Sequence, residues 1–93
     1  MAIWDEQKRN KVIANHGVDF AKIRDVFEDP FSIYIQDSKH SENEERWVVI
    51  GRTAQYGLVS LTYTLRGDDI RFITARRAEK WMVKDYEKQR KRT

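Results

Sequence analysis

Arg76 and Arg77 are the residues of this sequence best suited to chemistry on a phosphate group. They follow the last predicted strand directly and precede the last predicted helix, so at least one side chain must project from the end of the sheet. Arginine is permanently charged and presents a planar fork that matches phosphate oxygens. The pair could therefore stabilise the charge that grows on a phosphate during its cleavage. Ion pairs with the acids of residues 42–45 or with Asp85 are an equally good explanation.

Two further residues could act with this pair. Arg52 closes another predicted strand and could converge on the same rim, and His16 lies beside Gly17 at a helix end, where it could transfer a proton near neutral pH. A histidine at a helix C-terminus is also favoured by the helix dipole alone. Basic side chains that could contact an RNA backbone are Lys8, Arg66, Arg71 and Lys80.

The tryptophans are a third kind of candidate, because indole rings can stack on nucleic-acid bases. For Trp4 and Trp81 a place in the core is the first interpretation, whereas Trp47 is ambiguous.

The sequence offers no pattern for a metal ion or a nucleotide cofactor. It has no cysteine, no glycine-rich phosphate loop and no His-Glu-x-x-His motif. His16 and His40 are far apart in sequence and have no evident third ligand. We therefore expect neither a cofactor nor a metal site, and the chemistry that remains is that of cationic side chains.

The charge of the chain is unevenly distributed. From residue 71 onward there are nine Lys and Arg against three acids, a net +6, whereas residues 1–70 hold nine against twelve, a net −3. Such asymmetry is a hint that one end of the chain faces a polyanion, although a basic end is often merely solvated. We expect residues 90–93 to form a frayed basic tail.

The length of 93 residues indicates a single domain, residues 1–93. The N-terminus lacks the apolar core of a signal peptide, and no apolar run approaches the length of a membrane span. The lack of cysteine is compatible with a reducing compartment. We therefore expect a cytoplasmic protein that does not contact a membrane.

Two helices are expected before the sheet. The first is capped by Asp5, runs to about Asn15 and stops at Gly17. The second is capped by Asp19 and ended by Pro30. Its apolar stripe, at helical spacing, consists of Phe20, Ile23, Val26 and Phe27.

Four strands are expected at residues 31–35, 46–52, 58–65 and 70–75, with a polar connection over residues 37–45. In the third of them, the apolar residues Val59, Leu61, Tyr63 and Leu65 alternate with Ser60, Thr62 and Thr64. A last helix should dock through a stripe at helical spacing that consists of Ala78, Trp81, Met82, Tyr86 and Gln89. This order predicts an α+β domain with two N-terminal helices, a four-stranded, mainly antiparallel sheet and a C-terminal helix, all helices packed on one face.

Taken together, several short motifs resemble those of one protein family. The first group is Trp4-Asp5 with Lys8, then His16-Gly17-Val18 and Phe20. The second is His40-Ser41-Glu42, Glu44-Glu45-Arg46 and Gly51-Arg52. The third is Arg71, Ile73, the block Ala75-Arg76-Arg77-Ala78, and Tyr86. In their order and spacing, over roughly residues 3–87, they resemble the BrnT family of toxins.

The resemblance implies a RelE-like fold and a ribonuclease toxin of a type II toxin–antitoxin system. Such a toxin cleaves mRNA and inhibits translation and growth. It is neutralised by a BrnA-type antitoxin with a ribbon-helix-helix domain, and the complex contacts operator DNA only through the antitoxin. The family's charged positions fall on Lys8, His16, Arg52, Arg76 and Arg77. We expect metal-independent cleavage, in which the RNA 2′-hydroxyl attacks the adjacent phosphate and leaves a 2′,3′-cyclic phosphate.

The sequence departs from the family pattern at three positions. Val12 stands where relatives commonly have Asn, Asn15 where they have Lys, and Met82 where they have Glu. These departures motivate an alternative, in which the chain is a catalytically weak, toxin-like binding module that acts in antitoxin docking and operon autorepression. A third hypothesis is a general RNA-binding protein that uses the basic C-terminal helix.

Overall fold

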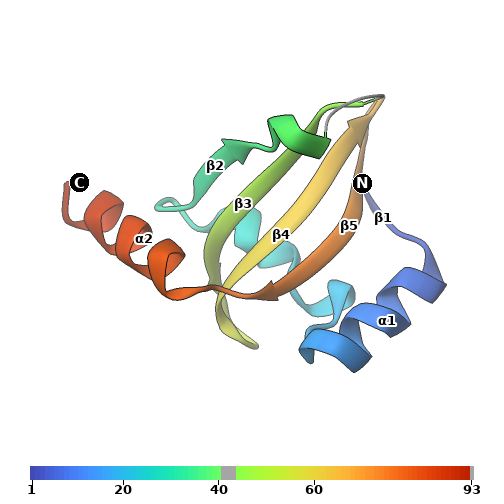
Figure 1. Cartoon of the computed structure of the whole chain (residues 1–93), viewed down its shortest axis with the longest axis horizontal. Coiled ribbons are helices and arrows are strands. Elements are labelled where there is room, and N and C mark those ends of the chain that lie inside the picture. The colour runs from blue at the N-terminus through green and yellow to red at the C-terminus, as the bar shows by residue number, and fades with distance from the viewer. Residues whose placement is uncertain (41–43, 93) are drawn as a thin grey trace.

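A five-stranded sheet with the strand order β1-β5-β4-β3-β2 forms the centre of the protein (Figure 1). The computed structural model describes residues 1–40 and 44–92, without the side chain of His40. The elements, with 3₁₀ helices written η, are β1 (Ala2–Ile3), α1 (Glu6–His16), η1 (Phe20–Lys22), η2 (Arg24–Glu28), β2 (Ile33–Gln36), η3 (Ser38–His40), β3 (Arg46–Thr53), β4 (Gly57–Arg66), β5 (Asp69–Arg77) and α2 (Lys80–Arg92).

The α+β class and the mainly antiparallel sheet are confirmed, but the sheet has one strand more than expected. Strands β2 to β5 pair antiparallel, and β1 adds to the outer edge of β5 as a parallel partner. The backbone N–H of Ile70 donates to the carbonyl of Met1 at 2.8 Å. A strand of two residues is too short to show an alternating pattern, so it could not be expected from the sequence.

The first helix forms as its caps predict. The Asp5 carboxylate accepts hydrogen bonds from the backbone N–H groups of Gln7 and Lys8, and Gly17 ends the helix with a φ of 67°. That left-handed conformation favours glycine. Along α1, Val12 is the residue that the fold buries, so the helix lies on the surface with one edge inside.

The expected second helix is wrong: residues 20–28 form the two short 3₁₀ helices η1 and η2 instead. The break falls at Ile23, whose φ of −126° is not helical. Phe20, Ile23 and Val26 are all fully buried and recur every third residue. A 3₁₀ helix repeats every three residues, so this spacing lines one face of a 3₁₀ turn as well as it lines an α-helix.

One face of the sheet carries the main core, beneath α1, η1 and η2 (Figure 1). Alternate residues of β3, β4 and β5 point into it, among them Val49, Leu61 and Ala75. Trp4, which is half-buried, stacks on Phe72 with ring centroids 5.6 Å apart, and Trp47 also packs against this cluster. We call this side the core face.

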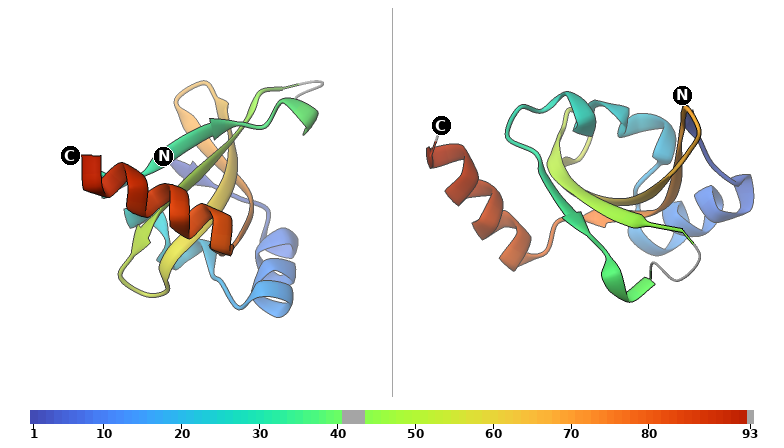
Figure 2. Two further views of the ribbon diagram at one scale, coloured as in Figure 1. Left: turned by 60° about the vertical axis from the view of Figure 1, so that its left-hand side comes forward. Right: turned by 90° about the horizontal axis from the view of Figure 1, so that it is seen from above.

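Helix α2 lies on the other side of the sheet, so the expectation that all helices pack on one face is wrong (Figure 2). Its buried residues are Met82 and Tyr86, and they cover the end of the sheet formed by β2 and β3, where Ile50 is also buried. Trp81 was expected in the core but is 48% exposed. Because α2 stands at one end, no helix of residues 1–40 and 44–92 lies in front of β4 and β5 (Figure 1). We call this side the open face.

None of the helices in the described part of the chain is long and apolar enough to span a membrane.

Candidate functional site

Arg76 and Arg77 are the last two residues of β5, not the first residues after it, and this changes what the pair can do. Successive side chains of a strand point to opposite faces. Arg76 is paired with Ser60 of β4 and points to the open face, whereas Arg77 is paired with the buried Val59 on the core face. Both side chains are exposed, but they do not form one clamp.

Arg76 lies at a small pocket together with His16. The pocket has a volume of about 230 Å³ and is lined by His16, Ser60, Thr74, Ala75 and Arg76. It forms where β1 no longer covers the edge of β5, because β1 pairs only with Ile70 and Arg71. Helix α1, which ends at His16, packs beside β5 (Figure 1). We call this cavity the His16–Arg76 pocket.

The guanidinium of Arg76 forms an ion pair with Glu79, just before α2. The sequence left open an ion pair with residues 42–45 or with Asp85. The observed partner is neither, while residues 42 and 43 lie outside the described residues. The side chain of Glu79 is 41% exposed, so the ion pair lies in a solvated setting where it contributes little to stability, and an anionic ligand could replace Glu79 at Arg76.

Arg77 packs on the other side of the strand against Tyr56. Its guanidinium lies 5.3 Å from the centre of the Tyr56 ring and donates to the Tyr56 carbonyl at 3.4 Å. The Tyr56 hydroxyl in turn accepts a hydrogen bond from the backbone N–H of Asp19 at 3.1 Å. Arg77 thus ties the turn between β3 and β4 to the segment that begins η1.

The open face carries arginines and hydroxyls in successive rows across β3, β4 and β5. One row consists of Arg46, Thr64 and Arg71, the next of Val48, Thr62 and Thr74, and the next of Ile50, Ser60 and Arg76. Arg52 and Arg66 belong to the same side by alternation. Thr64 is buried and its hydroxyl donates to the Glu45 carbonyl at 2.7 Å, and Ser60 is 6% exposed, so the hydroxyls that reach the surface are those of Thr62 and Thr74. These hydroxyls and the guanidinium groups donate hydrogen bonds that suit phosphate and ribose oxygens. This surface is therefore suited to an RNA backbone.

Arg52 lies one row beyond Ile50, Ser60 and Arg76, at the same end of the open face as Arg76, and it contacts α2. Its guanidinium lies 5.8 Å from the centre of the Tyr86 ring, and its backbone N–H donates to Asp29 at 2.8 Å. The buried Tyr86 hydroxyl donates to the same carboxylate at 2.7 Å. Burial raises the pKa of Tyr86, as does its bond to Asp29. Partial burial opposes ionisation of Asp29, but the bonds from Tyr86, Phe31 and Arg52 outweigh it and lower the pKa of Asp29.

The structure does not bring every sequence-predicted residue to the His16–Arg76 pocket. Lys8 is half-buried on α1, and Lys80 is the exposed first residue of α2. Arg66, at the end of β4, bonds to Glu44 at 3.3 Å, and this bond lowers the pKa of Glu44. Arg71 is half-buried on the open face two rows away from Arg76.

Two of the three departures from the family pattern are core residues in this chain. Val12 is 6% exposed and Met82 is 5% exposed, so both serve packing, whereas Asn15 is exposed beside His16. Within residues 1–40 and 44–92, no group of three acidic or histidine side chains is arranged to hold a metal ion.

Three residues of the site were not predicted from the sequence: Ser60, Thr74 and Glu79, which line the pocket or pair with Arg76. The signal for Ser60 was present, because it alternates with the buried residues of β4 and must face the opposite side. Thr74 could be found only from the pairing of β4 with β5, which places Thr62 opposite Thr74 and includes an irregularity between Thr62 and Tyr63.

An open sheet face of arginines and hydroxyls defines a protein suited to contact a polyanion. The family model described as "Ribonuclease toxin, BrnT, of type II toxin-antitoxin system" matches residues 4–81. The chain therefore belongs to the BrnT family of ribonuclease toxins, as its motifs indicated.

A solved structure supports the same assignment. The 1.1 Å crystal structure of the Brucella abortus ribonuclease toxin, BrnT, is similar with a TM-score of 0.68 and 29% sequence identity. The match covers 86% of this chain and 99% of that chain. None of the curated proteins compared with the chain matches it.

Proposed function

We propose that this chain is an endoribonuclease toxin that cleaves mRNA without a metal ion, with its reaction centre in the His16–Arg76 pocket. The observation that carries the proposal is that His16 and Arg76, from opposite ends of the chain, line one cavity at the edge of the open face. Membership of a ribonuclease toxin family supports the choice of RNA as the substrate.

In the proposed reaction, the RNA 2′-oxygen forms a bond to the adjacent phosphorus and the bond from phosphorus to the 5′-oxygen breaks. His16 accepts the proton of the 2′-hydroxyl, and water protonates the departing 5′-oxygen. Arg76 exchanges Glu79 for the phosphate and stabilises the negative charge of the pentacoordinate state. The products are a 2′,3′-cyclic phosphate and a free 5′-hydroxyl.

The remaining basic residues have positioning roles in this proposal. Arg71 and Arg66 hold the RNA backbone along the open face, and Lys80 extends the contact at the start of α2. Lys8 contacts RNA that passes beyond β5 to α1. Arg52 positions the backbone near α2. Arg77, although adjacent to Arg76, contributes through its contact with Tyr56 on the core face.

The proposal for growth inhibition and its control rests on membership of the family. We propose a RelE-like relationship of the fold and a BrnA-type ribbon-helix-helix antitoxin that neutralises the toxin and alone contacts operator DNA. In the second candidate function the chain is a catalytically weak module for antitoxin docking and autorepression. The observation that favours it is that Val12 and Met82 are buried and apolar at positions where the resemblance places polar residues.

The test is cleavage of a defined RNA by the purified chain in the presence of EDTA, followed by analysis of the product ends. The expected result is undiminished cleavage with 2′,3′-cyclic phosphate ends, and no cleavage where the scissile nucleotide is 2′-deoxy. Loss of cleavage in EDTA that Mg²⁺ restores would overturn metal independence. No cleavage at all, with binding of antitoxin intact, would favour the weak module.

A matched pair of substitutions on α1 tests the role of His16. His16→Ala should lower the cleavage rate by about 10²-fold or more, because positioned proton transfer contributes about 10²–10⁴-fold. Asn15→Ala changes the exposed neighbour and should leave the rate within a few-fold. Equal effects of the two variants would remove His16 from the reaction.

A further inference from the structure

Strand β2 forms one edge of the sheet, at the end farthest from the His16–Arg76 pocket. Among the described residues it pairs with β3 alone, with Ile33 opposite Ile50 and Ile35 opposite Val48. The N–H of Asp37 donates to the carbonyl of Arg46 at 2.8 Å. In an antiparallel pair every second residue bonds to the neighbouring strand, so the backbone groups of Ile33 and Ile35 also point to β3. By that alternation the backbone groups of Tyr34 and Gln36 point to the open edge. Such an edge is a template for pairing with another chain.

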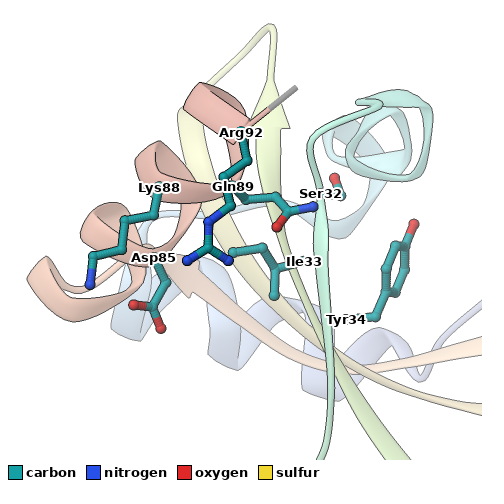
Figure 3. Close-up of a pocket in the computed structure, with 7 residues that line it drawn as sticks. All are labelled: Ser32, Ile33, Tyr34, Asp85, Lys88, Gln89 and Arg92. Atoms are coloured by element: carbon teal, nitrogen blue, oxygen red, sulfur yellow. The ribbon is translucent and has the colours of Figure 1, made fainter.

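A groove of about 480 Å³ runs along this edge, between β2 and the C-terminal half of α2 (Figure 3). Its strand side is Ser32, Ile33 and Tyr34. On the helix side Gln89 is directed toward β2, and the Arg92 guanidinium turns down into the space beside Ile33 (Figure 3). We call this cavity the β2 groove.

A second, more apolar hollow continues the β2 groove toward the start of α2. It is about 220 Å³ in volume and is lined in part by Ile35, Val48, Trp81 and Met82. Ile35 is 36% exposed, Trp81 is 48% exposed and Tyr34 is 48% exposed, so large apolar groups line the whole edge in contact with solvent. Together the two hollows follow the full length of β2.

The charge of α2 along the β2 groove indicates what kind of segment the groove binds. Residues 80–92 carry six Lys and Arg against two acids, and Lys88 and Arg92 border the β2 groove beside Asp85. A second copy of this chain is a poor partner, because its β2 reads Ile-Tyr-Ile-Gln without an acid and would bring a second basic helix against the first. An extended segment with acidic side chains would satisfy both the backbone edge and the cations.

We propose that the β2 groove docks an extended, acidic segment of the antitoxin, which adds to β2 as a further strand. Main-chain hydrogen bonds to Tyr34 and Gln36 hold the segment, its acids meet Lys88 and Arg92, and its apolar side chains cover Ile35 and Trp81. The inference rests on the proposed function only in taking the partner to be an antitoxin. Strands β3, β4 and β5 separate the groove from the edge with His16, so this segment anchors the antitoxin without filling the pocket.

The first test compares two double charge reversals on α2 with the antitoxin from the same operon as the probe. Lys88→Glu with Arg92→Glu should weaken the complex by about tenfold or more, because both charges border the groove. Lys84→Glu with Lys91→Glu makes the same change in net charge outside the groove and should change Kd by less than about threefold. Equal weakening by both pairs would overturn the proposal.

The second test is residue-resolved amide hydrogen exchange of the whole toxin, alone and in the complex. The amides of Tyr34 and Gln36 should gain protection of about tenfold or more on binding, whereas those of Ile33 and Ile35 are protected already by β3. Gln36→Pro should weaken the complex and keep the β2–β3 bonds, while Gln36→Ala should bind normally. Unchanged exchange at Tyr34 and Gln36 would overturn strand addition.

These outcomes are separable from those of the proposed function. Absent RNA cleavage, with Tyr34 and Gln36 protected in the complex, would refute the enzyme and keep the docking site. If the Lys88 and Arg92 reversals weaken RNA binding and leave antitoxin binding intact, the groove serves RNA and the proposal fails. Dimerisation of the free toxin that Gln36→Pro abolishes would assign the edge to a second copy, and the proposal would fail in that case too.

Discussion

The core face and the open face of the sheet are made from the same three strands, yet they meet opposite demands. On β4, Val59, Leu61 and Tyr63 are buried beneath α1, η1 and η2, while Ser60, Thr62 and Thr64 point the other way. The core face has to be covered, because apolar area buried from water supplies most of the stability of the fold. The part of the open face that α2 leaves uncovered does not have to bury apolar area. It can therefore carry charged side chains.

The two faces differ most clearly at Arg76 and Arg77. They have the same side chain and adjacent positions, but β5 turns one to the open face and the other to the core face. Arg76 pairs with an exposed acid and lies at a cavity with His16, whereas Arg77 lies over Tyr56. Strand geometry, more than residue type, therefore decides which arginine can reach a substrate.

The largest expected difference between the two faces is in stability. Phe72→Ala, on the core face of β5 and 1% exposed, should lower the free energy of unfolding by about 3–5 kcal/mol. Thr74→Ala, on the same strand and exposed on the open face, should change it by less than about 0.5 kcal/mol. Denaturant titration measures both. Similar losses for the two variants would contradict the assignment of the faces.

A smaller loss is expected at the contact that holds α2. Tyr86→Phe removes the hydroxyl that donates to Asp29 and should cost about 1–2 kcal/mol, because that hydroxyl and the carboxylate are partly buried. The matched control is Tyr34→Phe, at a side chain that is 48% exposed, which should be nearly neutral. Thermal unfolding of the two variants separates them, and a neutral Tyr86→Phe would show that α2 is held by packing alone.

The acid stability of the core-face side depends on Asp19. Hydrogen bonds from Arg9, with further contributions from Ala21 and Lys22, lower the pKa of Asp19 from 3.8 to about 2. A carboxyl whose pKa is lowered on folding stabilises the fold above its ordinary pKa, and that contribution is lost as the pH falls through 3.8 toward 2.

The expected loss over that window is about 1–2 kcal/mol, reduced by solvent because Arg9 is partly exposed. Asp19→Asn keeps a capping side chain but has no carboxylate to titrate. Its free energy of unfolding should therefore be lower at neutral pH and flatter between pH 4 and pH 2. The same pH dependence in both proteins would exclude the Arg9–Asp19 pair as its source.

The smallest expected effect is on the salt dependence of RNA binding, which should differ between an arginine of the open face and an arginine of the core-face side. Arg71→Gln, on the open face, should reduce the slope of log K against log salt by about 0.7 for single-stranded RNA. Arg24→Gln is the control, because Arg24 lies 5.5 Å from the centre of the Trp4 ring on the core-face side, and it should leave the slope unchanged. Anisotropy of a labelled 2′-O-methyl RNA gives both slopes. A drop for Arg24→Gln as large as for Arg71→Gln would contradict the open face as the RNA surface.

Features governed by neighbours in sequence could be predicted. Helix α1 follows from Asp5 and Gly17, and the alternation in β4 places Val59, Leu61 and Tyr63 in the core. The two errors in the elements have different causes, one local and one non-local. A spacing of three residues at Phe20, Ile23 and Val26 suits both an α-helix and a 3₁₀ helix. The two residues of β1 are defined by pairing with β5, which no local pattern reports.

The candidate site was predicted less completely than the fold, because a site depends on which strands are neighbours. His16 and Arg76 were both named from the sequence, but their meeting depends on the packing of α1 beside β5. The separation of Arg77 from Arg76 required knowing that β5 extends to residue 77 instead of ending at 75. One or two residues of strand length therefore decided how the arginine pair is interpreted.

The most direct test of the account is the single-turnover rate of RNA cleavage by Arg76→Ala and Arg77→Ala, measured side by side. Arg76→Ala should lower the rate by about 10²–10³-fold, the usual effect of removing one preorganised charge from a developing oxyanion. Arg77→Ala should lower it by less than about tenfold and instead cost about 0.5–1 kcal/mol of stability through its contact with Tyr56. Equal losses of rate, or a larger loss for Arg77→Ala, would contradict a reaction centre on the open face.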